Sequence, residues 1–471
     1  MRQLKEYPNK FSEIWSWQYN CFLHLLNTKM TERSNQMSTI TRSLTKDWEE
    51  LVSSIPDDLE KSAIEYGAMQ RTRKIKSAAD LLRIILIYAT VLSLLTTAMW
   101  ALGLGLCDIS RQAIEKRVLK STPWLRYILS ALLKSVMETP DKVGGPVRRF
   151  ILRDASVISR PGSSGTEWRL HLSWFPFSLQ PAQVVVTDEK TGEGLENAGL
   201  QAGDLVVADR AHGIWRTISV VLEVLAYFII RLTWSNLPLQ NLDGTPFDLI
   251  AWLQKLPEKQ EYAEVTVIVR DDPKQRPLRL VAGRLPPDKA EETRHKAKKQ
   301  AHKNKREPKS ETLLAAGFCI LLTNLPPTNW PVLQVLAFYR IRWQIEWCFR
   351  RWKSLCQLNV LPVYPAKIAE PVLLAKLIII LLMQQRLGYL PWRDWWASEQ
   401  PAPVISPVVQ MTYLRVCEII RPIVVIDQLL TDPKPFLRHL RSSRRKRPLQ
   451  LAEATRRFAG LLPGFSPGPA G

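Results

Sequence analysis

Four apolar residues in a row between two aspartates, within Asp204 to Asp209, limit the folds open to this chain. The run reads Leu205-Val206-Val207-Ala208. Side chains of a strand alternate between the two faces of its sheet, so a run that is apolar at every position predicts a strand covered on both faces. Such strands lie at the centre of α/β sheets. The segment therefore predicts a sheet with helices on both sides.

Three further apolar segments bounded by turn-forming residues precede this strand and predict a mixed sheet. They are Phe150–Leu152, which ends at Asp154, then Trp168–Phe175 and Gln183–Val186. Residues 1–140 instead repeat apolar side chains every three or four positions with almost no glycine, which is typical of helices. The predicted fold class is α/β, a mixed sheet flanked by helices, with an all-α N-terminal region.

Two features of the N-terminal region have alternative interpretations. Ser93 to Lys120 resembles two helices joined by a glycine-containing turn, which is either a DNA-binding helix-turn-helix or an ordinary helical hairpin. Ile84 to Cys107 contains no charged residue and is long enough to span a bilayer. Its serine, threonine and glycine residues favour two short buried helices, so we expect no membrane association.

The charge balance predicts a polyanionic partner. The chain has 65 Lys plus Arg against 44 Asp plus Glu, a formal net charge of +21. Such a surplus favours nucleic acid or an anionic membrane surface, because binding releases condensed counterions. A content of 46% apolar residues excludes a mostly disordered chain.

The cysteines and the N-terminal residues are informative about bound zinc and about the cellular location. The six cysteines are scattered without a C-x-x-C pair, which argues against zinc. The first residues lack the apolar core of a signal peptide, so we expect a cytoplasmic protein with reduced thiols.

Residues 214–325 combine strand-like segments with a basic helical stretch, Asp288 to Lys309. This stretch is either a solvated helix or a contact for a phosphate backbone. Beyond Pro401 the chain becomes proline-rich and basic, which predicts a helical and basic tail.

The segment Phe338 to Lys353 carries most of the chemical information. On a helical wheel its apolar residues form one stripe, and the adjoining face holds a phenol, three cations and one carboxylate. A carboxylate among cations suits a phosphodiester with a metal ion, since the acid binds the ion and the cations bind phosphates. The alternative is an amphipathic helix in which the acid pairs with cations four residues away on either side. The residues of this face are Tyr339, Arg342, Glu346, Arg350 and Lys353.

The spacing of Tyr339, Arg342, Glu346 and Lys353 resembles the Y-x2-R-x3-E-x6-K signature of the insertion-sequence family four transposases. The resemblance covers about residues 149–385. It implies an RNase H-like fold with one aspartate on the first strand, another at the fourth and a glutamate on a late helix. In this chain these acids are Asp154, Asp209 and Glu346.

The residues around both aspartates depart modestly from the family pattern. The family usually has Asp-Gly-Thr at the first site and Asp-Arg-Gly-Tyr at the second, whereas this chain has Asp154-Ala155-Ser156 and Asp209-Arg210-Ala211-His212. Asp188 is a rival for the second acid, but the following Glu-Lys-Thr-Gly predicts a turn.

The resemblance implies a DNA transposase that cleaves the ends of a mobile element and joins the 3′-OH to target DNA. Two Mg²⁺ ions, or Mn²⁺, would be held by Asp154, Asp209 and Glu346. The partners would be double-stranded DNA and a second copy of the chain on DNA, at the nucleoid. The rival interpretations are a nuclease of the same fold without strand transfer and a decayed copy that only binds DNA. The predicted DNA contacts are Tyr339, Arg342, Arg350, Lys353 and Arg210.

Five parts are expected along the chain. They are a helical region at 1–140, the first part of the catalytic core at 146–213, a β-rich insertion at 214–325, the second part of the core with the glutamate helix at 326–400, and the tail at 401–471. The tryptophans Trp234, Trp330 and Trp343 have two interpretations, core packing and stacking on a flipped base.

Overall fold

A computed structural model describes residues 46–70, 74–137, 146–192, 194–363, 365–392, 396 and 404–440. The chain divides into two compact units, Met1–Ser53 and Ser54–Gly471, and the features below belong to the second. The sequence predictions for residues 1–45 and 441–471 lie outside the described residues.

The first described part of this unit is helical, as predicted. Serine side chains cap three of its helices, because Ser77, Ser93 and Ser110 each accept a hydrogen bond from a backbone N–H three residues on. Leu92 adopts a left-handed conformation, with φ of 52°, and splits the uncharged run into two helices. Nowhere in the described ranges does a helix combine the length and the apolar character needed to cross a bilayer. The helices are α3 (Leu59–Glu65), α4 (Ala78–Val91), α5 (Leu94–Gly103), α6 (Arg111–Lys120) and α7 (Thr122–Met137).

A mixed sheet follows, which confirms the predicted α/β class. Its strand order is β3-β2-β1-β4-β5-β9-β8-β7-β6. β1, β4 and β5 run parallel to one another, and every other pair is antiparallel. The strands are β1 (Arg149–Ile158), β2 (Trp168–Phe175), β3 (Gln180–Asp188), β4 (Asp204–Ala208), β5 (Tyr227–Arg231), β6 (Leu239–Gln240), β7 (Tyr262–Val269), β8 (Pro277–Arg284) and β9 (Phe318–Thr323).

Two features of the sheet differ from the expected strand pattern. β1 does not end at Asp154, because its pairing with β2 continues to Ile158 opposite Trp168. β5, within residues 214–325, pairs directly with β4, and β9 pairs with β5. The sheet therefore runs without a break from the strands of the first core part into those of the expected insertion.

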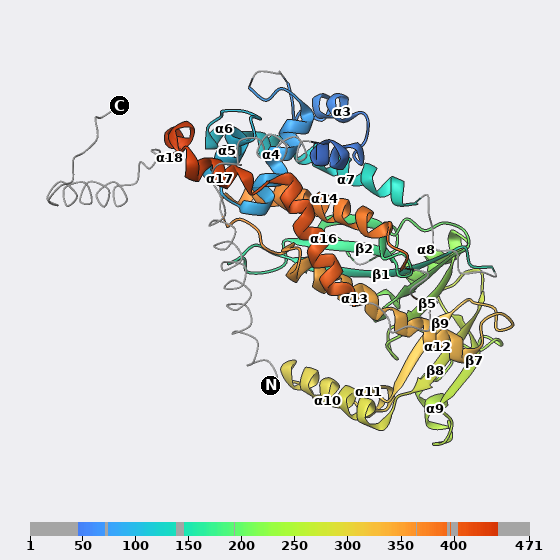
Figure 1. The fold of residues 1–471 in the computed structure, drawn as a ribbon. Coiled ribbons are helices and arrows are strands. Elements are labelled where there is room, and N and C mark those ends of the chain that lie inside the picture. Colours follow the sequence, from blue (N-terminus) through green and yellow to red (C-terminus); the bar gives the residue numbers. More distant parts are fainter. Residues whose placement is uncertain are drawn as a thin grey trace. The chain divides into compact units, whose positions relative to one another are not determined.

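Several of the remaining helices connect the strands or pack on the sheet, and others pack on the N-terminal helices (Figure 1). α14 (Ala369–Gly388) is almost wholly buried and contacts α7, α4, β3 and α16 (Ile405–Ile420), which explains its nearly continuous apolar sequence. α12 (Val332–Ile341) is followed directly by α13 (Trp343–Ser354), which packs on β1. The others are η1 (Arg210–His212), α8 (Trp215–Glu223), α9 (Leu249–Gln254), α10 (Pro287–Lys303), α11 (Ser310–Ala315), η2 (Ala366–Ile368), α17 (Val424–Thr431), η3 (Lys434–Phe436) and α18 (Leu437–Leu440).

Candidate active site

Asp154 and Asp209 lie side by side because of the register between β1 and β4. The parallel pairing sets Arg153 opposite Ala208, and each aspartate is the next residue along its chain. Neighbouring strands are about 4.8 Å apart, and residues at one level point to the same face of the sheet. The structure therefore brings together the two aspartates selected from the sequence.

Asp209 is held by two hydrogen-bond donors from the short η1 helix. Its Oδ1 accepts the Ala211 N–H at 2.9 Å and lies 3.1 Å from Nδ1 of His212, a side chain that is 1% exposed. Burial by itself raises the pKa of Asp209, but these hydrogen bonds and the nearby positive charge outweigh it and leave the pKa below its ordinary value. Asp209 is thus positioned as an ionised carboxylate.

Asp154 is the more buried carboxylate of the two, with 17% of its side chain exposed against 32% for Asp209. Burial raises the pKa of Asp154 to about 6, and the negative charge of Asp209 contributes in the same direction. The Ala155 N–H donates to Asp154 at 2.8 Å, and this bond and Arg342 oppose the rise. Two crowded acids with opposed pKa shifts are typical of a functional site.

Arg342 joins the third acid to this pair. It stands at the junction of α12 and α13, where one guanidinium nitrogen lies 3.5 Å from Asp154 Oδ2 and the other donates to Glu346 Oε1. Nε of Arg342 is buried and has no hydrogen-bond partner among the described residues. Pairing of Glu346 with the cation four residues earlier, one of the sequence interpretations, is present. Arg350, four residues later, instead lies over the Trp347 ring at 4.6 Å.

The other predicted DNA contacts differ in exposure. Lys353 is tied to β1, because its Nζ donates to Ser156 Oγ at 2.7 Å and to the Val157 carbonyl at 2.9 Å. Tyr339 is buried beside Arg342, whose guanidinium carbon lies 5.9 Å from the ring centre. Arg350 and Arg210 are exposed.

The tryptophans divide between the core and the surface. Trp330 is buried, and Trp234 packs against the apolar cluster that contains side chains of β4 to β9. Trp343 is 59% exposed and Trp347 is 47% exposed, on the two sides of Glu346 along α13.

Two residues beside the acids were not selected from the sequence. His212 is a loop histidine in the sequence pattern, and its contact with Asp209 depends on the η1 turn. Arg231 ends β5, and because Ala208 pairs with Ile230, it stands level with Asp209. Its side chain has no ion-pair partner within the described ranges. The sequence signal that could have identified Arg231 is a cation at the end of a buried apolar strand.

Asp188 forms the turn predicted for it. Its Oδ1 accepts hydrogen bonds from the Thr191 N–H at 3.0 Å and the Thr191 hydroxyl at 2.8 Å. It ends β3, the edge strand, which is separated from β1 by β2. Asp188 is therefore not part of the acidic group.

The donor chemistry of the three acids suits a hard divalent cation, since carboxylate oxygens are the ligands Mg²⁺ prefers. In the described ranges, however, no three Asp, Glu, His or Cys side chains are grouped closely enough to hold a metal ion. Arg342 contacts both Asp154 and Glu346. Binding an ion by all three acids would therefore require this guanidinium to move away from them.

The family model and the sequence relatives agree on one family. The family model described as a transposase DDE domain matches residues 146–381. The transposase for insertion sequence element IS421 of Escherichia coli is 31% identical over 349 residues, which cover 71% of this chain and 92% of that protein. The transposase for IS231F of Bacillus thuringiensis subsp. israelensis is 26% identical, covering 58% of this chain and 65% of that protein. A cryo-EM structure of piggyBac transposase with hairpin DNA aligns over 89% of this chain and 84% of its own, with 10% identity and a TM-score of 0.39.

Proposed function

Because this chain belongs to the family of DDE transposases, we propose that Asp154, Asp209 and Glu346 carry its phosphodiester chemistry. The chain is an enzyme, a DNA transposase. The observation that supports the assignment is the β1–β4 register, which sets Asp154 beside Asp209, together with the contacts of Arg342 that join Glu346 to Asp154.

The family generally uses divalent metal ions. We propose two Mg²⁺ ions, replaceable by Mn²⁺, held by the three acids. Ions in such a site lower the barrier by activating an attacking water or 3′-OH and stabilising the leaving oxygen. Asp209, already ionised and fixed by His212 and the Ala211 amide, would be the ligand that needs least rearrangement.

Cations around the acids would bind the DNA backbone. Arg350 and Arg210 are exposed and can reach phosphates directly. Arg342 would exchange its carboxylate partners for a phosphate when the acids bind their ions. Lys353 would hold α13 against β1, and the buried Tyr339 would support Arg342 from beside it, so that these contacts stay in place.

The proposed substrates are double-stranded element ends and target DNA. Joining two ends to one target requires two active sites, so we propose a homodimer on DNA. A reaction on chromosomal DNA places the protein in the cytoplasm, at the nucleoid.

Replacing Glu346 with Gln tests the assignment. We expect cleavage of element ends in Mg²⁺ to be lost, while binding of the same DNA stays near the parental level. Asp188→Asn is the matched control, because Asp188 also follows a strand but forms a turn on the edge strand, so it should cleave normally. Parental cleavage by Glu346→Gln would reject the role of Glu346.

A second assay separates a transposase reaction from simple nuclease activity. Pre-cut element ends are incubated with a supercoiled target plasmid and Mg²⁺. Strand transfer gives joined products, whereas a nuclease without strand transfer gives cuts and no joined product.

A further inference from the structure

α10 leaves the sheet at the same edge as the two aspartates. β8 is antiparallel to β9, which is antiparallel to β5, so β8 runs in the same direction as β1, β4 and β5. The register carries across the sheet, since Ala208 pairs with Ile230, Ile230 with Leu322, and Leu322 with Leu280. β8 then continues to Arg284, and α10 begins at Pro287.

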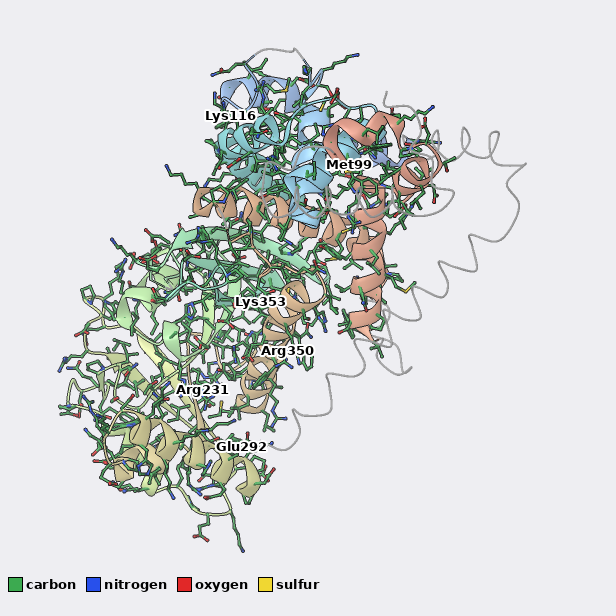
Figure 2. The ribbon with its side chains drawn as sticks, turned by 90° about the vertical axis from the view of Figure 1, so that its left-hand side faces the viewer. Met99, Lys116, Arg231, Glu292, Arg350 and Lys353 are labelled. Atoms are coloured by element: carbon green, nitrogen blue, oxygen red, sulfur yellow. The ribbon has the colours of Figure 1, made fainter. Side chains whose placement is uncertain are left out.

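The lateral separation between β4, which precedes Asp209, and β8, which leads to α10, is shorter than one turn of a bound duplex. β4 and β8 are three strand positions apart, about 14 Å at the usual spacing. One turn of a DNA duplex is about 34 Å long. Arg231 of β5 lies in between, and Figure 2 shows it between Arg350 of α13 and Glu292 of α10.

The end of α10 carries cations that the protein itself does not neutralise. Acidic residues near its start pair with nearby cations: Glu292 with Lys289 and Lys296, and Glu291 with Arg294. Further along, five exposed cations have no ion-pair partner among the described residues. We call them the α10 cation cluster: Lys298, Lys299, Lys303, Lys305 and Arg306.

The packing of α10 leaves a polar surface exposed and available for binding. Its less exposed side consists mainly of small residues, including Ala290 and Ala297. It contacts α11, where Arg294 Nε donates to the Leu313 carbonyl at 3.3 Å. No residue of α10 is among the exposed large apolar side chains of the described chain. A helix that lies in a membrane surface needs an apolar face, so an anionic membrane fits poorly.

Lys305 stands where a glycine would be easier to accommodate. The helix closes with hydrogen bonds from Arg306 N to Ala301 O and from Lys305 N to His302 O, the Schellman pattern. Lys305 adopts the left-handed conformation there, with φ of 53°. This conformation costs a residue with a Cβ about 1 kcal/mol relative to glycine. A lysine at this position is therefore better explained by its charge than by the fold.

We propose that the α10 cation cluster binds the phosphate backbone of the DNA duplex that extends from the catalytic acids, without reading its bases. The helical part of the cluster, residues 298–303, spans about 8 Å at helical rise, and duplex DNA carries about one phosphate per 1.7 Å of its axis. The inference rests on the proposed function for its choice of duplex, but its test does not depend on catalysis.

The test is the salt dependence of DNA binding. Fluorescence anisotropy with a 30-base-pair duplex of random sequence, without divalent ions, gives log Kd against log[KCl]. Replacing Lys298, Lys299 and Lys303 with Gln should reduce the slope by about 2.7, since each phosphate contact contributes about 0.9. The control replaces three other exposed lysines, Lys190, Lys255 and Lys259, with Gln and should change the slope by less than one such contact. An unchanged slope in the α10 variant would overturn the proposal.

Two further measurements distinguish phosphate binding by the cluster from a structural role of α10 and from binding to a membrane. Lys305→Gly should raise the unfolding temperature and still reduce the slope by about one contact, a combination that a structural role would not give. Sedimentation with phosphatidylglycerol vesicles tests the membrane alternative, and a loss of vesicle binding with an unchanged DNA slope would overturn the proposal. Because binding is measured without cleavage, Glu346→Gln can fail as a catalytic test while the α10 result stands.

Discussion

The hydrogen bond between His212 and Asp209 allows a quantitative test of how the site is held together. His212 is 1% exposed, and its Nδ1 provides one of two donors to Asp209 Oδ1, the other being the Ala211 amide. His212→Leu removes the donor and keeps an apolar side chain in the buried position. His212→Asn keeps a donor close to the position of Nδ1.

The expected effect follows from the charge of the acceptor. A hydrogen bond to an ionised group contributes about 1.5–3 kcal/mol, roughly 10- to 150-fold in an equilibrium. Residues that orient a metal ligand typically change metal affinity or activity by about 10- to 100-fold. We expect His212→Leu to need about 10- to 100-fold more Mg²⁺ for half-maximal cleavage, and His212→Asn to stay within about fivefold of the parent.

The assay is cleavage of element ends over a Mg²⁺ series, with DNA binding measured by anisotropy. Unfolding temperatures of both variants show whether the fold tolerates each change. If His212→Leu is folded, binds DNA and needs no more Mg²⁺ than the parent, then the bond does not position Asp209 for its ion, and the reasoning is refuted.

Three further predictions concern stability. Burial lowers the pKa of Lys376 to about 8 from 10.5, so between these pH values the unfolded chain binds more protons than the folded chain. The free energy of unfolding should therefore rise with pH over this range by up to about 3 kcal/mol. Lys376→Met should abolish this rise, measured by urea unfolding at pH 7.5 and pH 10. Asp204→Asn leaves the buried Arg149 without its ion-pair partner and should cost about 3–5 kcal/mol, seen as a lower unfolding temperature. Ser110→Ala removes the N-cap of α6 and should cost about 1 kcal/mol, with faster amide exchange at Ala113.

The sequence was sufficient where a local pattern determines the structure. The apolar run after Asp204 is β4, buried at every position. The hairpin predicted for Ser93 to Lys120 is α5 and α6, because Ser93 and Ser110 cap both helices. Whether this hairpin binds DNA as a helix-turn-helix stays a prediction, as do the domain boundaries.

The sequence was insufficient to predict features that depend on pairing between distant segments. The sequence pattern ended this strand at Asp154, whereas pairing with β2 keeps Ala155 to Ile158 in it. Likewise, Tyr227–Arg231 has the pattern of one more strand of an insertion, and only its pairing with β4 makes it the neighbour of the acids. The position of Arg231 beside Asp209 follows from that pairing and could not be derived without it.

On the proposed function, the two sequence interpretations of Glu346, pairing with a helical neighbour and binding a metal ion, belong to one mechanism. Two carboxylates that lie as close as Asp154 and Asp209 repel each other, and this repulsion adds to the burial that raises the pKa of Asp154. Arg342 offsets that charge and holds Glu346 nearby. On the proposed function, the same ion pairs must open when divalent ions take over the neutralisation, which frees the guanidinium for a phosphate. A simple surface ion pair does not explain why Nε of Arg342 is buried without a partner among the described residues. A cation that exchanges its carboxylate partners for a phosphate does explain it.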